Sequence, residues 1–271
     1  MAARRQQVQR FGACGFTLVE LVVVIVLMSL VSLAGVEMIR YAADSYQKMS
    51  SRQALGSASR VAVERISRDL RGALPNSVRV NALGNCLEFI PVKTVGTYIT
   101  LPVDSPGNSF ASVPLSLGQE ATVGPVVVYP LTTAKVYSAA GGVMSSAASV
   151  SAPDVDNVVT VSLAANFQFA LHSPTSRYFL VDTPVSYCVD GGYLFRYRDY
   201  GVLATQPSVA TLPAALPTRA LLADGLGISA DPFQLATATL VRNALVTLDL
   251  LFVEAGESTR LVSEVQLRNV P

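Results

Sequence analysis

A nearly uninterrupted apolar segment at the start of the chain constrains the fold more than any other feature. The segment Phe16–Val36 contains one acidic residue, Glu20, and no basic residue. Its length is close to the ~20 apolar residues that a helix needs to cross a bilayer. A carboxylate at the centre of a membrane helix costs roughly 2.5–3.5 kcal/mol, and less near the edge, so such residues are usually functional. The segment therefore predicts a membrane-spanning helix in which Glu20 has a specific role.

The residues before this segment form a basic leader. Met1–Gly15 contains three arginines and no acidic residue, so the positive-inside rule keeps it in the cytoplasm. In an ordinary secretory signal the apolar region precedes the cleavage site, whereas here it follows Gly15. The basic leader, Gly15, Phe16 and Glu20 at these spacings resemble the class III signal of type IV pilins and of type II secretion pseudopilins.

This resemblance implies a processing route and a set of partners. A prepilin peptidase would cut between Gly15 and Phe16 and methylate the new amino group of Phe16. Glu20 lies four residues after Phe16, hence on the same helix face, and could pair with that ammonium within one chain or between neighbours in a filament. Other pilin and minor pilin subunits and an inner-membrane assembly platform are the further partners implied. The alternative is a plain signal anchor in which the acid has no role.

A second stretch extends the resemblance over the first third of the chain. The run ERISRDLRGALPNSVRV at Glu64–Val80, followed by CLEF at Cys86–Phe89, resembles the minor-pilin class that includes the secretion pseudopilin J. It is most similar to the MshO family, the minor pilins of the mannose-sensitive haemagglutinin (MSHA) pilus. The resemblance implies an α+β fold: a long N-terminal transmembrane and amphipathic helix, then an antiparallel β-sheet domain of one or two sheets.

Helical periodicity continues beyond the apolar segment. Apolar residues recur mostly at spacings of three and four, which indicates an amphipathic helix; they are Ile39, Ala43, Tyr46, Leu55, Ala58, Ala62, Ile66 and Leu70. Gly72 and Pro75 supply the stop. A straight helix of this length would measure roughly 80 Å. We expect four segments: a removed leader (1–15), a transmembrane half-helix (16–36), a periplasmic half-helix (37–74) and a β-rich globular domain (75–271).

Short β-prone runs separated by Gly, Pro, Ser and Asn follow the helix. The predicted strands are Ser77–Val80, Cys86–Val92, Thr122–Tyr129, Asn157–Leu163, Tyr178–Val181, Ser186–Val189 and Tyr193–Tyr197. A turn at Asp190-Gly191-Gly192 predicts a hairpin, and alternation over Ala244–Val253 and again after Gly256 predicts a second one. Three stretches without a period are predicted to be long loops: Thr100–Ser116, Ser138–Asp156 and Thr205–Thr218.

The cysteines suggest one disulfide. Of the three, Cys14 would leave with the leader, while Cys86 and Cys188 would remain beyond the membrane, where thiols oxidise. Two cysteines allow a single pairing, so we expect a Cys86–Cys188 bridge. Two free buried thiols are the alternative.

The sequence offers no catalytic constellation and no cofactor site. The net charge of +1 gives no electrostatic case for nucleic acid. A single histidine, His172, and two distant cysteines lack metal-ligand spacing. Asp154, Asp156 and Asn157 could hold calcium, but a solvated turn is favoured because the EF-hand spacing is absent. We therefore expect a protein that is not an enzyme.

An aromatic set is the remaining candidate for contact with a sugar or a partner, although strand residues that alternate between core and solvent explain it more simply. The set comprises Tyr193, Phe195, Tyr197 and Tyr200, with Arg196 and Arg198.

The interpretation that best unites these features is a minor pilin, single-pass in a bacterial inner membrane. Its globular domain would face the periplasm, and the subunit would enter an extracellular pilus at its tip or in the complex that starts assembly. A type II secretion pseudopilin is the first alternative. A pilus-borne adhesin that binds through Ser138–Asp156 and Thr205–Thr218 is the second, and a bitopic membrane enzyme is the most remote.

Overall fold

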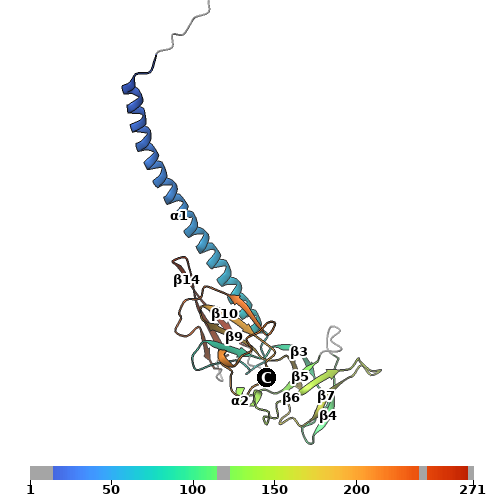
Figure 1. Ribbon diagram of the computed structural model, residues 1–271. Coiled ribbons are helices and arrows are strands. Elements are labelled where there is room, and N and C mark those ends of the chain that lie inside the picture. The colour runs from blue at the N-terminus through green and yellow to red at the C-terminus, as the bar shows by residue number, and fades with distance from the viewer. Residues whose placement is uncertain (1–14, 115–122, 238–242, 268–271) are drawn as a thin grey trace, which may run out of the picture. The chain divides into compact units, whose positions relative to one another are not determined.

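The computed structural model describes residues 15–114, 123–237 and 243–267. A helix of 54 residues, α1 (Leu18–Arg71), is followed by strands (Figure 1). The chain divides into two compact units between Ser50 and Ser51, so α1 contributes to both. The α+β class predicted from the sequence is confirmed.

The C-terminal part of α1 has a buried face. The predicted stripe is confirmed at Leu55, Ala62, Ile66 and Leu70, which are all buried, whereas Ala58 is exposed. The helix ends at Arg71, three residues before the predicted end. The amide of Gly72 bonds the Asp69 carbonyl at 3.1 Å, which tightens the last turn, and proline follows.

Three antiparallel sheets follow α1 within the described residues, one more than the largest number expected. The first has the order β1 (Arg79–Val80), β2 (Cys86–Phe89), β9 (Val185–Asp190), β10 (Tyr193–Tyr197) and β11 (Arg219–Ala223). The second has the order β12 (Phe233–Ala236), β13 (Leu245–Glu254) and β14 (Glu257–Gln266). The third has the order β3 (Val92–Thr97), β8 (Arg177–Val181), β5 (Gly124–Val128), β6 (Met144–Val150), β7 (Val159–Phe167) and β4 (Gly107–Ser112).

The first two sheets share a core with the end of α1. Ile66 and Leu70 of the helix belong to the same buried cluster as Leu87 of β2 and Val246 and Phe252 of β13. Each of these side chains is at most 1% exposed. Burial of one such side chain stabilises a fold by about 1.5–3 kcal/mol, so this cluster anchors the end of the helix to both sheets.

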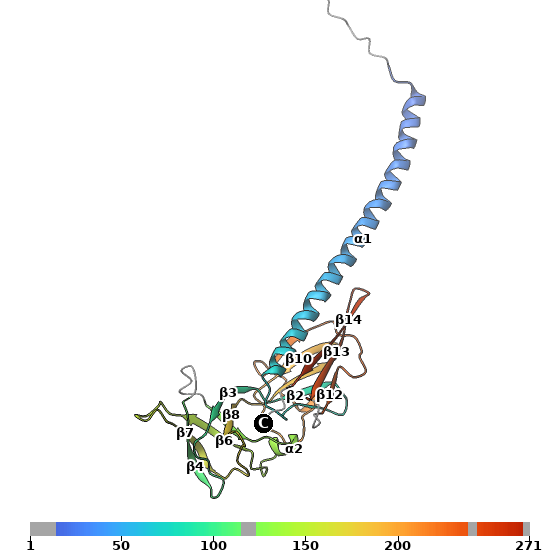
Figure 2. The ribbon, with the colours of Figure 1, turned by 180° about the vertical axis from the view of Figure 1, so that it is seen from behind.

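The third sheet is an insertion between two paired strands of the first. Every strand from β3 to β8 lies in sequence between β2 and β9, which pair with each other (Figure 2). Phe89, the last residue of β2, is paired with Val185, the first residue of β9. The chain therefore leaves the first sheet and returns to it at adjacent positions.

The inserted sheet curls until its two edges meet. The amide of Ile99 donates to the carbonyl of Ala111 at 2.7 Å, and the amide of Val113 donates to the carbonyl of Thr97 at 2.9 Å. These bonds join the end of β3 to β4, so the strands β3–β8 and their described connections form a barrel, which we call the inserted barrel. Its interior is filled by small aliphatic and aromatic side chains, among them Phe110 and Tyr178, whose rings meet edge to face at 5.3 Å.

A smaller apolar cluster joins the inserted barrel to the rest of its unit. Leu74 and Ile90 pack in it with Phe179 of β8 and with Tyr137, which follows the short helix α2 (Thr133–Val136). The amide of Leu74 also bonds the carbonyl of Ile90 at 2.8 Å. Apolar packing and backbone pairing thus both hold the barrel at the end of α1.

The predicted hairpins are confirmed. Tyr193–Tyr197 is β10 as predicted, and its pairing with β9 places Gly191 and Gly192 in a two-residue turn. The final hairpin pairs β13 with β14, and its turn is formed by Ala255 and Gly256, whereas the sequence predicts the turn at Gly256-Glu257-Ser258. Both turn residues have positive φ, 49° and 82°, as the right-handed twist of a tight hairpin requires.

Several strand predictions were wrong. Two of the predicted loops contain strands: Thr100–Ser116 holds β4, and Ser138–Asp156 holds β6. The predicted strand Cys86–Val92 is two strands, because the chain turns at Pro91 into the inserted barrel. The strands β11 and β12 had no counterpart among the predictions. Thr205–Thr218 contains only a short 3₁₀ turn, η1 (Val209–Thr211), and Thr122 lies outside the described residues.

Candidate functional site

The residues around the predicted cleavage position form a short non-helical segment followed by a capped helix. Gly15, Phe16 and Thr17 are exposed and precede α1. Thr17 occupies the N-cap position, where its hydroxyl oxygen accepts the Glu20 amide at 3.3 Å. The sequence from Thr17 to Glu20 has the S/T-x-x-E spacing of a capping box. Glu20 therefore lies in the first helical turn, where the helix dipole favours a carboxylate.

Nothing in the local structure requires glycine at position 15. A Cβ built on Gly15 meets no atom within 4 Å. Among the described residues, the Glu20 carboxylate makes no ion pair. Both residues are thus open to a partner outside the chain.

No side chain in the first half of α1 is buried against the residues that the structure describes. Residues 18–50 are all exposed, although they include most of the large apolar side chains of the helix. The mean hydropathy reaches 2.6 over 18 residues, which makes α1 long and apolar enough to cross a membrane. Two hydroxyls in this region are satisfied inside the helix: Ser29 donates to the carbonyl of Val26, and Ser32 donates to the carbonyl of Met28. Internal pairing of this kind suits a non-aqueous environment.

Residues 10–36 match the family described as Prokaryotic N-terminal methylation motif. The chain carries a prepilin-type signal. The signal supports a type IV pilin-like or pseudopilin-like protein, for which processing by a prepilin peptidase and assembly with other pilins are implied. The single apolar helix behind the signal is consistent with membrane anchoring. No curated protein and no solved structure matches the chain.

The two cysteines expected to remain after removal of the prepilin signal are joined in a disulfide. Cys86 on β2 and Cys188 on β9 are paired across the ladder, with Cα atoms 4.2 Å apart, and both are fully buried. They lie in the first sheet, in the unit that begins at Ser51.

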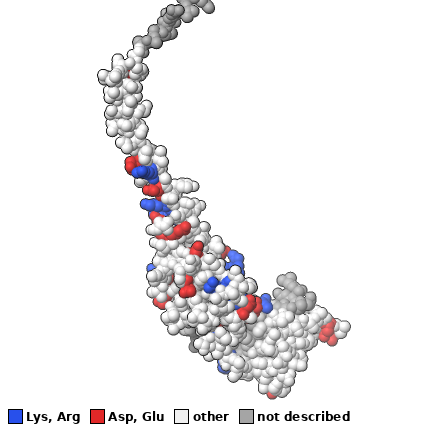
Figure 3. Space-filling model, viewed as in Figure 1, with Lys and Arg blue, Asp and Glu red and all other residues white. Residues whose placement is uncertain are grey.

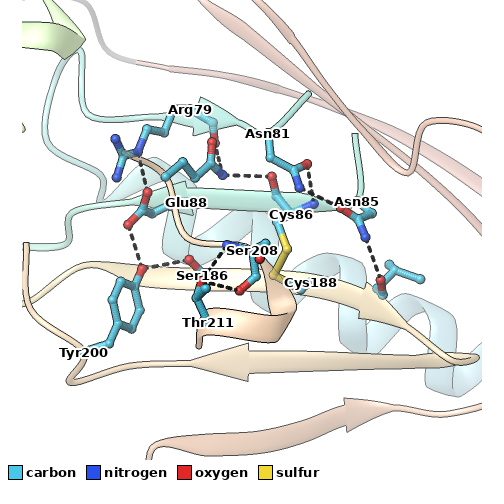
Figure 4. The surroundings of a disulfide bond; sticks show 12 residues. Arg79, Asn81, Asn85, Cys86, Glu88, Ser186, Cys188, Tyr200, Ser208 and Thr211 are labelled. Carbon is cyan, nitrogen blue, oxygen red and sulfur yellow. Dashed lines mark hydrogen bonds and ion pairs between the residues drawn. A yellow bond between two sulfur atoms is a disulfide. The ribbon is translucent and has the colours of Figure 1, made fainter. Parts of the chain in front are cut away.

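A buried carboxylate lies two residues from this disulfide (Figure 4). Glu88 is 0% exposed and forms an ion pair with Arg79. The hydroxyl of Tyr200 donates to the second carboxylate oxygen at 2.9 Å and lies 2.7 Å from the Ser186 hydroxyl. Burial, and then the neighbouring Glu88 charge, raise the pKa of Tyr200 well above its usual value of about 10. Tyr200 is therefore a neutral donor at physiological pH.

Arg79 ties a further loop to this carboxylate. Its guanidinium donates to the carbonyls of Leu203 and Ala204, both at 2.8 Å, and lies 3.6 Å from the centre of the Tyr137 ring. Burial raises the pKa of Tyr137 well above its usual range. The network connects β1, β2, the loop after β10 and the inserted barrel.

A second polar cluster fixes the end of α1 to the first sheet. The hydroxyl of Tyr187 donates to the Asp69 carboxylate at 2.7 Å, and burial followed by Asp69 raises the pKa of Tyr187. Arg65 lies 3.3 Å from the other oxygen of Asp69, and Arg196 lies 3.6 Å from the oxygen that Tyr187 contacts. The sequence stretch that resembles minor pilins thus contributes Asp69 to the helix–sheet contact.

The remaining candidates from the sequence do not combine into a site. Asp154 accepts the amides of Asp156 and Val158 at 3.0 and 2.8 Å, which makes the predicted turn. His172 is exposed in the loop before β8, with Nδ1 3.5 Å from the Tyr98 hydroxyl. Within the described ranges, no group of three or more His, Cys, Asp or Glu could hold a metal ion.

The aromatic set is divided between core and surface. Tyr197 is buried and Tyr200 is bound to Glu88, whereas Tyr193 is 46% exposed. No local pattern marks Glu88 and Arg79 as partners, because their ion pair depends on the register between β1 and β2.

Proposed function

We propose that this chain is a minor pilin of a type IV pilus of the MSHA kind, with a structural role in starting assembly or at the fibre tip. One observation carries the proposal: a prepilin-type signal directly precedes an apolar helix whose first half buries nothing in its own chain. The proposal gives that half-helix a place to bury its surface, first in the inner membrane and then among other subunits.

The energetic argument rests on the exposed apolar side chains of α1. Between Leu21 and Val36 they lie on every side of the helix and no charged residue interrupts them. Full burial of one Val, Leu or Ile is worth about 1.5–3 kcal/mol, so such a surface is unstable in water. Lipid or neighbouring helices must cover it.

Processing at Gly15 and the role of Glu20 belong to the same proposal. A prepilin peptidase would cut the exposed bond between Gly15 and Phe16 and methylate the Phe16 amine. Glu20 would then pair with the Phe16 amine of a neighbour as the subunit leaves the assembly platform. The pairing lowers the cost of a carboxylate in lipid, which supports a filament role for Glu20.

The disulfide supports the proposed location of the globular unit. Stable disulfides are characteristic of the periplasm and the cell exterior and are rare in the cytosol. Cys86 and Cys188 lie beyond the apolar helix, on the side opposite to the basic leader by the positive-inside rule.

A second function is favoured by the inserted barrel. Because the barrel is inserted between the paired strands β2 and β9, its loops can contact a ligand without disturbing the core of the first two sheets. This arrangement suits a pilus-borne ligand-binding module. A third role, that of a type II secretion pseudopilin, is compatible with the prepilin-type signal. Deletion of the gene separates these roles. Loss of piliation would support the minor pilin, and loss of protein secretion would support the pseudopilin. Loss of adhesion with normal fibres would support the adhesin.

The proposed assembly role is tested with Glu20→Ala in the native host. Pili are sheared from cells, and the amount of this subunit in the fibre fraction is compared with the amount in membranes. Membrane abundance should hold or rise, while the fibre fraction falls at least about tenfold. Glu37→Ala is the matched control, since Glu37 lies on the same helix beyond the apolar segment and its one ion pair among the described residues is with exposed Arg40 at 3.7 Å. Equal incorporation of Glu20→Ala and wild type would refute the assembly role.

A further inference from the structure

The inserted barrel carries an acidic projection whose end is exposed. The turn between β6 and β7 extends beyond the rest of the barrel (yellow-green in Figures 1 and 2). Val155 at its end is 100% exposed, and Asp154 and Asp156 on either side are also exposed. We call these three residues the acidic tip. Figure 3 shows acidic side chains at this end of a barrel surface that is otherwise almost uncharged.

The tip is held in one conformation by hydrogen bonds. Besides accepting two amides through its side chain, Asp154 pairs its own amide with the carbonyl of Val158 at 2.9 Å. The amide of Ser151 bonds the carbonyl of Thr160 at 2.9 Å and continues the hairpin up to the tip. The tip is thus preorganised, which lowers the entropy cost of docking into a partner.

A pocket of complementary character lies beside the end of α1. Its volume is about 630 Å³, within the range of ~300–1,000 Å³ typical of binding pockets, and it is lined by residues at the end of α1 and on β3 and β8. The walls are apolar and include Pro75, Val92, Val95 and Phe179. The two charged residues of the lining are Arg71 and Arg177. We call this site the arginine pocket.

The arginine pocket is free to receive a ligand. Neither the guanidinium of Arg71 nor that of Arg177 makes a hydrogen bond or an ion pair with any residue that the structure describes. Val95 is 47% exposed, so the apolar wall reaches solvent. Two unpaired guanidiniums around an apolar floor match an apolar side chain between two carboxylates.

We propose that the acidic tip of one copy of this chain docks in the arginine pocket of a second copy. Val155 would enter between Val95 and Phe179, and Asp154 and Asp156 would pair with the two arginines. The tip and the pocket are different parts of the barrel, so the contact is head-to-tail: the first copy keeps a free pocket and the second copy keeps a free tip. The inference does not depend on the proposed function, because it uses only contacts of the unit after Ser51.

Photocrosslinking of the full-length chain in detergent tests this contact. Copies with two different affinity tags are co-expressed, and p-benzoylphenylalanine replaces Val155 in one of them. The expected product is a dimer of the two tagged chains, with the crosslink on a peptide that contains Val95 or Phe179. A crosslink that maps elsewhere on the second copy, a crosslink to a different protein, or no crosslink would overturn the proposal.

Charge exchange makes the test specific. The variants Asp154→Lys/Asp156→Lys and Arg71→Glu/Arg177→Glu should each lose at least about tenfold in crosslinking to themselves, since each brings like charges together. A mixture of the two variants should regain the wild-type yield, because both contacts then pair opposite charges. A reversed-charge variant that crosslinks to itself like wild type, or a mixture that fails to recover, would contradict the proposal.

Two further variants control for loss of crosslinking caused by misfolding. Asp104→Lys/Lys135→Glu makes similar changes at exposed barrel positions outside the tip and the pocket and should leave the yield unchanged. Arg71→Gln/Arg177→Gln removes the pocket charge without placing acids at the helix end and should still reduce the yield about fivefold. An unchanged yield in the glutamine variant would count against the pocket as the docking site.

Discussion

Cys86 and Cys188 close one end of the β2–β9 ladder, and the pair Phe89–Val185 forms the other end, where the inserted barrel is attached. The disulfide thus links the two strands from which the whole barrel extends. The residues it joins are 102 apart in sequence, and this span contains every strand of the barrel. The bond fixes the separation of the two chain segments that enter and leave the barrel.

Loss of this disulfide should destabilise the fold. Cys86→Ser and Cys188→Ser should each lower the free energy of unfolding by about 2–5 kcal/mol, because closing a loop of ~100 residues then costs its full chain entropy. The double variant should match the single variants, since the bond is already absent. Urea unfolding of the full chain in detergent measures the change. Two reactive thiols in the unfolded, non-reduced mature chain would show that the bridge does not form.

Substitution at the predicted cleavage position should block processing and leave the fold unchanged. Gly15→Arg adds a side chain where a Cβ meets nothing within 4 Å, so any effect arises outside the chain. We expect the wild-type chain to begin at Phe16 in membranes and the variant to keep its leader. Intact-mass measurement of membrane extracts checks this. Removal of the leader from the variant, or a wild-type start elsewhere, would contradict the proposed site.

Mutation of the two partners of the buried ion pair should lower the free energy of unfolding by different amounts. Arg79→Met leaves the fully buried Glu88 carboxylate without its cation and should cost about 3–5 kcal/mol. Glu88→Gln should cost less, about 1–3 kcal/mol, because Arg79 keeps two carbonyl acceptors and the Tyr137 ring. Comparison of the urea midpoints of the two variants decides the order. An equal or reversed order would contradict the prediction.

The contact between β13 and β14 should make stability depend on pH. Arg260 donates to Asp249 through Nε at 2.7 Å and Nη2 at 2.5 Å, and these hydrogen bonds hold the pKa of Asp249 below its usual value. A carboxyl with a lowered folded-state pKa stabilises the fold above its unfolded pKa of about 3.9 and loses that contribution as the pH falls through the folded pKa.

Asp249→Asn should therefore unfold at lower urea concentration than wild type at pH 7, and the difference should shrink below about pH 4. Asp104→Asn is the control, since Asp104 is exposed and forms no ion pair within the described residues. A gap between Asp249→Asn and wild type that stays constant from pH 7 to pH 3 would show that the pair does not contribute.

The sequence alone determined the elements that depend on local pattern. The apolar segment, the prepilin-type signal and the helical stripe up to Leu70 are encoded within single stretches, so their periodicity is readable without a partner. The hairpins at Gly191-Gly192 and Gly256 could also be predicted, because the residues that favour positive φ in a turn are recognised locally in the sequence. Membership of the α+β class followed from these elements.

Tertiary structure alone decided the inserted barrel. The strands β4 and β6 consist largely of Gly, Asn, Ser and Ala, which have low strand propensity, and they are strands because β7 pairs with both of them. Small residues such as Ala148 suit the narrow interior of a closed sheet, a need that no local pattern reveals. The partners of Glu88, the ladder that aligns Cys86 with Cys188 and the arginine pocket likewise depend on segments far apart in the chain. Their energies come from pairing and burial across the fold, and only the folded chain brings those groups together.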